Sequence, residues 1–148
     1  MGHAEYSNTP LSSRMGFLLV RSALRVRQRY VNELSTIGLL PNQHAILSTL
    51  NELGPCHQKE LAARIDLDTG DIVAYLDGLA EAGYIERNRD PADRRRQIVS
   101  LTPSGTRILA IADLALDEVE AETFACLALP ERKAFGHNLN TLYESLTS

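Results

Sequence analysis

The segment of residues 83–105 constrains the fold more than any other part of the chain, because helix, strand and turn signals alternate along it. Gly83 suits the left-handed backbone position that ends a helix. Thr102 offers an N-cap oxygen and Pro103 suits the first position of a new helix. Between these ends, apolar residues predict two short strands: Tyr84 and Ile85, then Ile98, Val99 and Leu101. The segment therefore predicts a hairpin held between two helices.

The expected turn of this hairpin is highly charged. Asp90-Pro91 marks a turn, and residues 93–96 (Asp-Arg-Arg-Arg) place three guanidinium groups at or just past its tip. An arginine-rich hairpin directly after a helix is typical of a winged helix that binds DNA. The alternative is a solvated hairpin, since most charge runs only face water.

Two helices are expected first along the chain. One covers about residues 11–34 and is apolar on two sides, so it needs two packing partners. The next begins at Pro41 and runs to Leu53, where Gly54-Pro55 stops it.

Two shorter helices precede the hairpin. The first covers residues 58–65. The second is expected to have Asp68 as its N-cap, with Asp71 in a capping-box-like position, and to end at Gly83. Only a few residues join them, which matches a helix-turn-helix whose second helix enters a DNA groove.

The chain ends in two expected helices, about residues 103–127 and from Pro130 onward. Together with the first helix, they carry more apolar surface than they can bury alone, so we expect them to form a homodimer interface. The prediction is a mainly α fold with a small β wing. Residues 37–102 form a winged helix-turn-helix DNA-binding region, and residues 1–36 and 103–148 form a helical dimerisation region.

Charge is distributed unevenly. The formal net charge is −4, but five arginines and no acid lie between Arg14 and Arg29, and five acids and no base lie between Asp113 and Glu122. This asymmetry indicates a basic working face and an acidic distal region. The overall acidity does not exclude DNA binding, because local phosphate contacts dominate its affinity.

The sequence indicates no membrane segment, metal site or cofactor. No apolar run approaches the ~18 residues that a membrane span needs, and the polar N-terminus lacks a signal-peptide pattern, so we expect a cytoplasmic protein. Cys56 and Cys126 lie far apart without metal-ligand spacing, which argues against a disulfide framework or a zinc site. The histidines lack metal-ligand spacing too: His3, His44, His57 and His137.

Several motifs together resemble the MarR family of bacterial transcription regulators, and the resemblance covers essentially the whole chain. The strongest are residues 90–95 (DPADRR) and 99–105 (VSLTPSG), which resemble the family's wing and its exit. Supporting motifs are residues 40–47 (LPNQHAIL), 59–62 (KELA), 75–79 (YLDGL) and 82–87 (AGYIER). Each motif is weak alone, but their order and spacing together are specific.

The resemblance implies a homodimer whose two wings and two recognition helices straddle a pseudo-palindromic operator in double-stranded DNA. It also implies a repressor that a small molecule releases. Arg95 would reach into the minor groove, where A·T-rich sequences concentrate negative potential, and Asp93 would orient it through a charge-assisted hydrogen bond.

The expected recognition helix departs from the family pattern, which commonly places Ser, Thr and Arg or Lys near positions 70, 71 and 74. Asp71 could accept a hydrogen bond from a cytosine amino group, or it could only stabilise the helix N-terminus. Val73 or Ala74 could touch a thymine methyl group. The full set predicted to contact DNA is Gln58, Lys59, Thr69, Gly70, Asp71, Val73, Ala74, Arg87, Asp93, Arg94 and Arg95.

The resemblance also implies an effector, such as an aromatic acid or a phenol, held between the dimerisation and DNA-binding regions. Arg14, Arg21 and Arg25 lie within about 40° on a helical wheel, and a guanidinium there could clamp a carboxylate. His44 would supply a neighbouring donor. These arginines could instead face solvent or pair with acids of a partner subunit.

An enzyme is not expected, and no residue is predicted to be catalytic. The sequence has no Gly-rich phosphate loop, GxSxG or HExxH motif, or recognisable Ser/His/Asp set. The alternative function is a winged-helix module that binds protein without sequence-specific DNA binding. Salt dependence separates the two, because binding through arginine–phosphate contacts weakens steeply with ionic strength.

Overall fold

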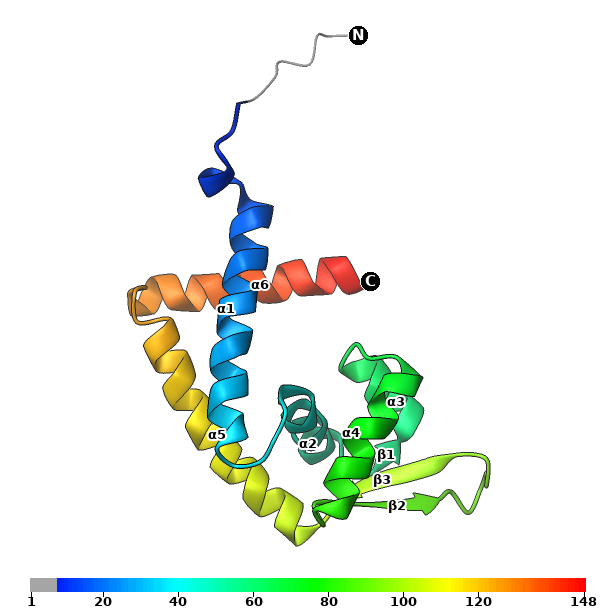
Figure 1. Cartoon of the computed structure of the whole chain (residues 1–148). Helices are drawn as coiled ribbons and strands as arrows, with labels where there is room; N and C mark the ends of the chain where they lie inside the picture. Colours follow the sequence, from blue (N-terminus) through cyan, green and yellow to red (C-terminus); the bar gives the residue numbers. More distant parts are fainter. Residues whose placement is uncertain (1–7) are drawn as a thin grey trace, which may run out of the picture.

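The computed structural model describes residues 8–148 and is mainly helical with one small sheet (Figure 1). Residues 1–7, which include His3 and begin the predicted dimerisation region, lie outside the described residues. The helices and strands are η1 (Leu11–Ser13), α1 (Met15–Ser35), α2 (Pro41–Leu53), β1 (Cys56–His57), α3 (Gln58–Arg64), α4 (Thr69–Glu81), β2 (Ile85–Arg89), β3 (Gln97–Leu101), α5 (Pro103–Thr123) and α6 (Leu129–Thr147).

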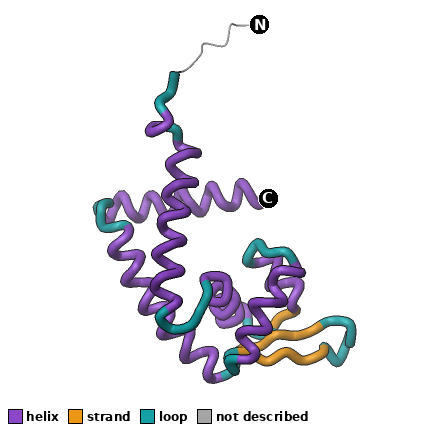
Figure 2. Tube along the Cα trace, viewed as in Figure 1, coloured by secondary structure: helices purple, strands orange, loops and turns teal. Residues whose placement is uncertain are grey.

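Helices α2, α3 and α4 and the sheet gather into one unit, here called the winged unit (residues 41–101). Helix α1 leads into it and α5 leads out of it, and these two helices pack against each other. Figure 2 shows the strands together at one side of the winged unit, with the hairpin loop projecting outward. Helix α6 turns back from the far end of α5 (Figure 1).

The sheet has three antiparallel strands in the order β1-β3-β2. The hairpin β2–β3 has the predicted position, with Ile85 opposite Leu101 and Arg89 opposite Gln97. The short strand β1 adds to the other edge of β3, where Cys56 lies opposite Val99. This pairing brings the start of α3 beside the hairpin.

One apolar core lies within the winged unit and extends into the adjoining ends of α1 and α5. Its buried side chains are Leu34, Leu39, Ile46, Leu47, Leu50, Cys56, Leu61, Ala62, Ile72, Leu76, Leu79, Ile85, Val99, Leu109, Ala112 and Leu116. Helix α4 shows why the sequence folds this way, because its apolar residues recur at helical spacing on the face that packs inward. The opposite face stays available to solvent.

The terminal helices bury little of their apolar surface within the protomer. Helix α6 has no buried residue, and α1 buries only Leu34. Large apolar side chains remain exposed along α1, α5 and α6, for example Met15 (84%), Leu114 (70%) and Leu146 (73%). No helix within residues 8–148 is both long enough and apolar enough to cross a membrane.

The expected helix ends need small corrections. The first helix begins at Met15 after a separate 3-10 turn, α5 ends at Thr123 rather than residue 127, and α6 begins at Leu129. Asp68 is the N-cap of α4, but its side chain makes no capping hydrogen bond, so the predicted capping box is wrong. The exposed Asp68 carboxylate faces water, and its backbone carbonyl accepts the N–H groups of Asp71 and Ile72.

The exit from the wing is tightly packed. Gly83 adopts φ 81°, the left-handed conformation predicted for it. The Thr102 hydroxyl donates to the Gly83 carbonyl at 2.6 Å and accepts from the Gly105 N–H at 3.0 Å, as expected of an N-cap. A Cβ atom on Gly105 would lie 2.0 Å from the Tyr84 carbonyl oxygen, so only glycine fits there.

Candidate nucleic-acid interface

Backbone hydrogen bonds fix the shape of the hairpin turn. The Asp90 N–H donates to the Arg96 carbonyl at 2.9 Å, and the Arg96 N–H donates to the Asp93 carbonyl at 3.0 Å. The guanidinium of Arg89 donates to the Arg94 carbonyl at 3.3 Å. The turn therefore holds its arginines on an ordered backbone while their side chains stay exposed.

Asp93 and Arg95 are paired at the tip of the turn. The Arg95 guanidinium donates to both carboxylate oxygens of Asp93, at 3.1 Å and 3.4 Å, and its backbone N–H donates at 3.2 Å. These bonds lower the pKa of Asp93, the side-chain bond most. Arg95 is 91% exposed, so Asp93 fixes its direction without covering it. The geometry expected of this pair is present, and its contact with DNA stays a prediction.

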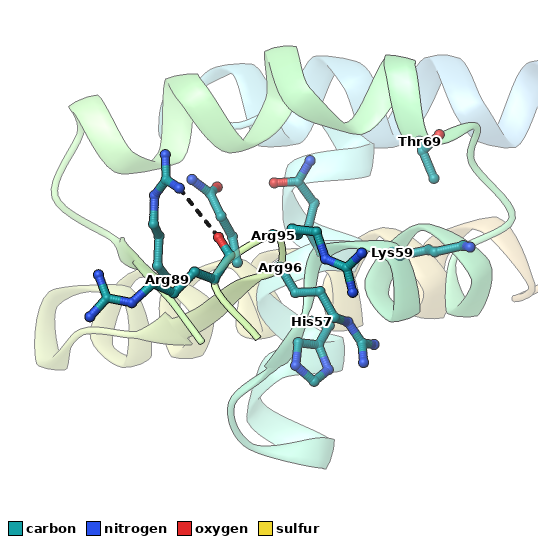
Figure 3. Close-up of a pocket in the computed structure, with 9 residues that line it drawn as sticks. His57, Lys59, Thr69, Arg89, Arg95 and Arg96 are labelled. Atoms are coloured by element: carbon teal, nitrogen blue, oxygen red, sulfur yellow. Dashed lines mark hydrogen bonds between the residues drawn. The ribbon is translucent and has the colours of Figure 1, made fainter. Parts of the chain in front are cut away.

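A hollow of about 590 Å³ lies between the wing, the start of α3 and the start of α4 (Figure 3). We call it the cationic hollow, because five of its lining residues are cations and none is an acid. Its lining residues are His57, Gln58, Lys59, Thr69, Arg89, Arg94, Arg95, Arg96 and Gln97. Cations gathered in a concave surface attract anions and raise their local concentration. The hollow is chemically suited to phosphate groups.

The structure brings together only some of the predicted DNA-contacting residues. Gln58, Lys59, Thr69, Arg94 and Arg95 line the cationic hollow. The other predicted residues of α4 do not line it, and all of them are exposed: Gly70, Asp71, Val73 and Ala74.

Arg87 is also outside the hollow. Its guanidinium donates to the Asp77 carboxylate of α4 at 2.7 Å, so much of its charge is matched within the protomer. A phosphate contact by Arg87 stays a prediction.

Sequence reasoning missed four residues that line the hollow: His57, Arg89, Arg96 and Gln97. Register could have identified two of them, because Arg89 and Gln97 are opposite each other at the last pair before the turn. Arg96 belongs to the arginine run that the sequence had already marked. His57 had no local signal, because its position depends on the pairing of β1 with β3.

Asp71 occupies the first turn of α4. Within residues 8–148, its side chain has no hydrogen bond or ion pair. A capping hydrogen bond therefore does not account for it, whereas an interaction with the helix dipole needs no direct bond. The exposed carboxylate is free to accept from a base amino group.

The four residues expected to hold an effector come from two parts of the chain, the start of α1 and helix α2. Arg14 is exposed as the residue that precedes α1, and Arg21 and Arg25 are exposed within α1. The Arg21 guanidinium lies 5.5 Å from the centre of the Phe17 ring. His44 faces α5, where its Nε2 lies 2.8 Å from Asp113 Oδ1. None of the four lines the cationic hollow. Their ligand role stays a prediction.

A second hollow, of about 440 Å³, lies between α5 and α6. It is lined by Asp117, Glu120, Ala121, Phe124, Arg132, Phe135, Gly136 and Leu139. Its mixture of acids and aromatic rings differs from the uniform charge of the cationic hollow.

Neither cysteine lies in a cationic site. Cys56 is buried, and burial raises the pKa of its thiol, which disfavours the reactive thiolate. Cys126 is exposed near the turn between α5 and α6. In the part of the chain that the structure describes, no group of three or more His, Cys, Asp or Glu residues could hold a metal ion.

The MarR family model matches residues 39–96. This range includes every residue that lines the cationic hollow except Gln97. Among curated relatives, the HTH-type transcriptional regulator SarZ of Staphylococcus aureus is 28% identical over 127 residues. The alignment covers 86% of this chain and 83% of SarZ. These matches are to transcriptional regulators, which agrees with the expectation that the chain is not an enzyme.

Solved structures extend the likeness to the terminal helices. A probable transcriptional regulator from Pseudomonas aeruginosa is 33% identical with a TM-score of 0.82, covering 90% of this chain and 99% of that one. The transcriptional repressor CouR bound to a 23-mer DNA duplex is 30% identical with a TM-score of 0.86, covering 95% and 99%. CouR from Rhodococcus jostii RHA1 bound to p-coumaroyl-CoA is 26% identical with a TM-score of 0.82, and the match covers 95% of this chain and 96% of that one.

These likenesses agree with the fold built from the residues. The predicted winged helix-turn-helix with helical N- and C-terminal regions is confirmed. The chain belongs to the MarR family of winged helix-turn-helix, DNA-binding transcriptional regulators.

Proposed function

We propose that this protein is a homodimeric, cytoplasmic repressor that binds a pseudo-palindromic operator in double-stranded DNA and is released by a small-molecule effector. The observation that carries the proposal is the cationic hollow, where five cations of the wing, β2 and α3 lie beside the first residue of α4. The solved DNA complex of CouR, at 30% identity over nearly the whole chain, supports it.

We expect different residues of the interface to contact phosphates, the minor groove and the major groove, according to where they are exposed. Lys59 and the arginines of the hollow contact phosphates, which gives affinity without sequence preference. Arg95, the most exposed of the paired arginines, reaches into the minor groove. The exposed face of α4 contacts base edges in the major groove through Asp71, Val73 and Ala74.

A second copy of the chain is the expected partner of the terminal helices. Their exposed apolar side chains lie on three helices of the protomer: α1, α5 and α6. Burying apolar surface stabilises association by about 25 cal/mol per Å² of area removed from water. A two-fold dimer would use this surface twice and present two winged units to two half-sites.

The effector is proposed to be an aromatic acid, a phenol or a derivative such as an aromatic thioester. The CouR complex with p-coumaroyl-CoA supports this class. Arg14, Arg21 and Arg25 are the candidate carboxylate clamp, and the second subunit would complete the site that one protomer lacks.

The first experiment is selection of genomic DNA fragments by the purified protein, followed by fluorescence anisotropy of the best fragment at two salt concentrations. We expect enrichment of an inverted repeat and steep weakening at the higher salt concentration. An aromatic acid that binds the regulator should release the same fragment. A folded dimer that enriches no fragment, tested without effector, would contradict the proposal.

A protein-interaction module is the second candidate, and the composition of α4 favours it. The exposed face of α4 carries carboxylates at Asp71 and Asp77 and no cation. A protein partner that binds the exposed apolar side chains of α4, such as Val73, would do so with little salt dependence, since apolar burial is screened far less than charge.

A further inference from the structure

His57 and Asp90 connect strand β1 to the start of the hairpin turn. His57 Nε2 lies 2.7 Å from Asp90 Oδ2, and the two side chains are 26% and 15% exposed. The other carboxylate oxygen, Oδ1, accepts the Ala92 N–H at 2.9 Å. Both oxygens of Asp90 are therefore occupied within the protomer. We call this pair the His57–Asp90 clasp.

His57 lines the cationic hollow, and its hydrogen bond to Asp90 connects the start of α3 with the hairpin turn. His57 precedes α3 as its N-cap residue, and the next residues along α3 bring Lys59 to one side of the hollow. Asp90 begins the turn that brings Arg94, Arg95 and Arg96 to the other side. The hydrogen bond thus ties the start of the turn that carries these arginines to the residue that precedes α3.

Charged groups around His57 come from several elements. Helix α3 contributes Lys59, and strand β2 contributes Arg89. The turn contributes Asp90 and the three arginines at positions 94–96. The lining residues from α4 and β3, Thr69 and Gln97, are uncharged. The cations disfavour a proton on His57, and Asp90 favours it. A phosphate group in the hollow would offset the cations and favour the imidazolium.

Of the two side-chain types in the clasp, an imidazole is the one whose ordinary range of charge change lies near neutral pH. The hydrogen bond from His57 is the largest cause that lowers the pKa of Asp90, so Asp90 stays a carboxylate at neutral and mildly acidic pH. An imidazole ordinarily changes charge at about pH 6.5. In both states of the ring, an N–H on Nε2 can donate to Asp90, so protonation adds charge without breaking the clasp.

We propose that the His57–Asp90 clasp positions the wing and couples DNA binding to a proton on His57, so that affinity rises as the pH falls. The inference rests on the proposed DNA-binding function. By linkage, a phosphate that favours the imidazolium is itself bound more tightly by the protonated protein. A dimer holds two clasps and takes up at most one proton at each.

The test is fluorescence anisotropy of the selected genomic duplex at pH 6.0 and pH 8.0 and constant ionic strength. If DNA raises an ordinary imidazole pKa of about 6.5 by about 0.6 of a unit at each of two clasps, the Kd is about tenfold larger at pH 8.0 than at pH 6.0. His57→Gln keeps an N–H donor for Asp90 but cannot titrate, so the ratio should fall below about twofold. His137→Gln, at an exposed position of α6, should keep the tenfold ratio.

The positioning role has its own readout. Asp90→Ala removes the acceptor, and we expect weaker DNA binding at both pH values, unlike His57→Gln. An NMR titration of the His57 ring in free protein adds a measurement that needs no DNA. In Asp90→Asn, the ring should titrate at a lower pH than in the wild type, because the carboxylate that favours its proton is gone.

Each outcome decides between the two proposals. A pH-independent Kd in the wild type, or an unchanged ratio in His57→Gln, would overturn the clasp while leaving DNA binding intact. Failure to bind any duplex at either pH would contradict the proposed function instead. In that case the clasp is tested by the NMR titration alone. If the His57 ring titrated at the same pH in Asp90→Asn as in the wild type, the clasp would be overturned.

Discussion

The winged unit and the terminal helices differ in what covers their apolar side chains. In the winged unit, leucines such as Leu47, Leu61 and Leu76 are fully buried within one protomer. In the terminal helices, leucines such as Leu114 and Leu146 remain largely exposed. The core of the winged unit, with Leu34 of α1 and Leu109 of α5 packed into it, is therefore complete within one protomer, whereas much of the apolar surface of the terminal helices remains exposed there.

The two regions differ in charge as well. The winged unit holds the cationic hollow, and α5 carries the acids at residues 113–122. Acidic residues placed away from the hollow leave its field intact, so a chain with a net charge of −4 still has a surface suited to phosphate. We expect the winged unit to face DNA and the terminal helices to associate, and the following variants test this proposal.

The largest effect is expected at the junction of the two regions, from Gly105→Ala. Its Cβ would lie 2.0 Å from the Tyr84 carbonyl oxygen, and backbone cannot move aside easily. We expect a loss of about 3 kcal/mol or more in the free energy of unfolding, measured by chemical denaturation. Gly16→Ala in α1 is the control, since its Cβ would meet no atom within 4 Å. Equal stability of both variants would refute the tight junction.

A matched pair of leucine truncations tests the difference in burial. Leu76→Ala should cost about 2–5 kcal/mol in unfolding free energy, because it leaves a cavity in the core of the winged unit. Leu114→Ala should cost far less within the protomer and act on dimer dissociation. Denaturation at two protein concentrations separates these effects, because only a change in dimer stability depends on concentration. Similar losses at both sites would contradict the comparison.

Association is tested by placing a charge on the apolar side of α6. Leu142→Glu should convert the dimer to a monomer at micromolar concentration, because an interface cannot bury an unpaired carboxylate without a large cost. Sedimentation velocity measures the change. Thr141→Glu places the same charge at a neighbouring exposed position and should remain dimeric. If Leu142→Glu stayed dimeric, α6 would not belong to the interface.

Within the winged unit, Arg95→Ala should weaken DNA binding by roughly 10- to 100-fold, since each subunit loses one charged contact. Arg95 is 91% exposed, so the unfolding transition should remain that of the wild type. Arg27→Ala removes an exposed arginine of α1 outside the hollow and serves as the control in the same anisotropy titration. Wild-type affinity of the Arg95 variant would show that the wing is misassigned.

The smallest effect is expected from Asp93→Asn, which leaves Arg95 in place but weakens its orientation. We expect a decrease in DNA affinity of about two- to fivefold. Since the folded-state pKa of Asp93 is lowered, its pairing contributes fully above the ordinary carboxyl pKa of about 4 and is lost as the pH falls through the lowered value. The ratio between the DNA affinities of the wild type and Asp93→Asn should therefore stay constant between pH 6 and pH 8. A change of this ratio with pH would contradict the pairing.

Most of the fold followed from local signals. Gly83, Thr102 and Pro103 fixed the ends of the hairpin, and each occupies the predicted position. The apolar spacing of α4 identified its buried face. The end of α5 was less predictable, since apolar residues continue to residue 127 although the helix ends at Thr123.

The candidate site was only partly predictable, because it depends on contacts between distant segments. The arginine run was visible in the sequence, and so was the pairing of Asp93 with Arg95, two residues away. His57 and Asp90 are 33 residues apart and meet only because β1 pairs with β3. A single sequence gives no sign of that pairing when a strand is two residues long.

The most direct test of the account is the salt dependence of DNA binding by the wild type and Arg95→Ala on the same duplex. The logarithm of the association constant should fall linearly with the logarithm of salt concentration, and the slope should be smaller by about two for the variant dimer, one contact per subunit. Equal slopes for the two proteins would contradict the central claim, that the wing arginines bind DNA through their charge.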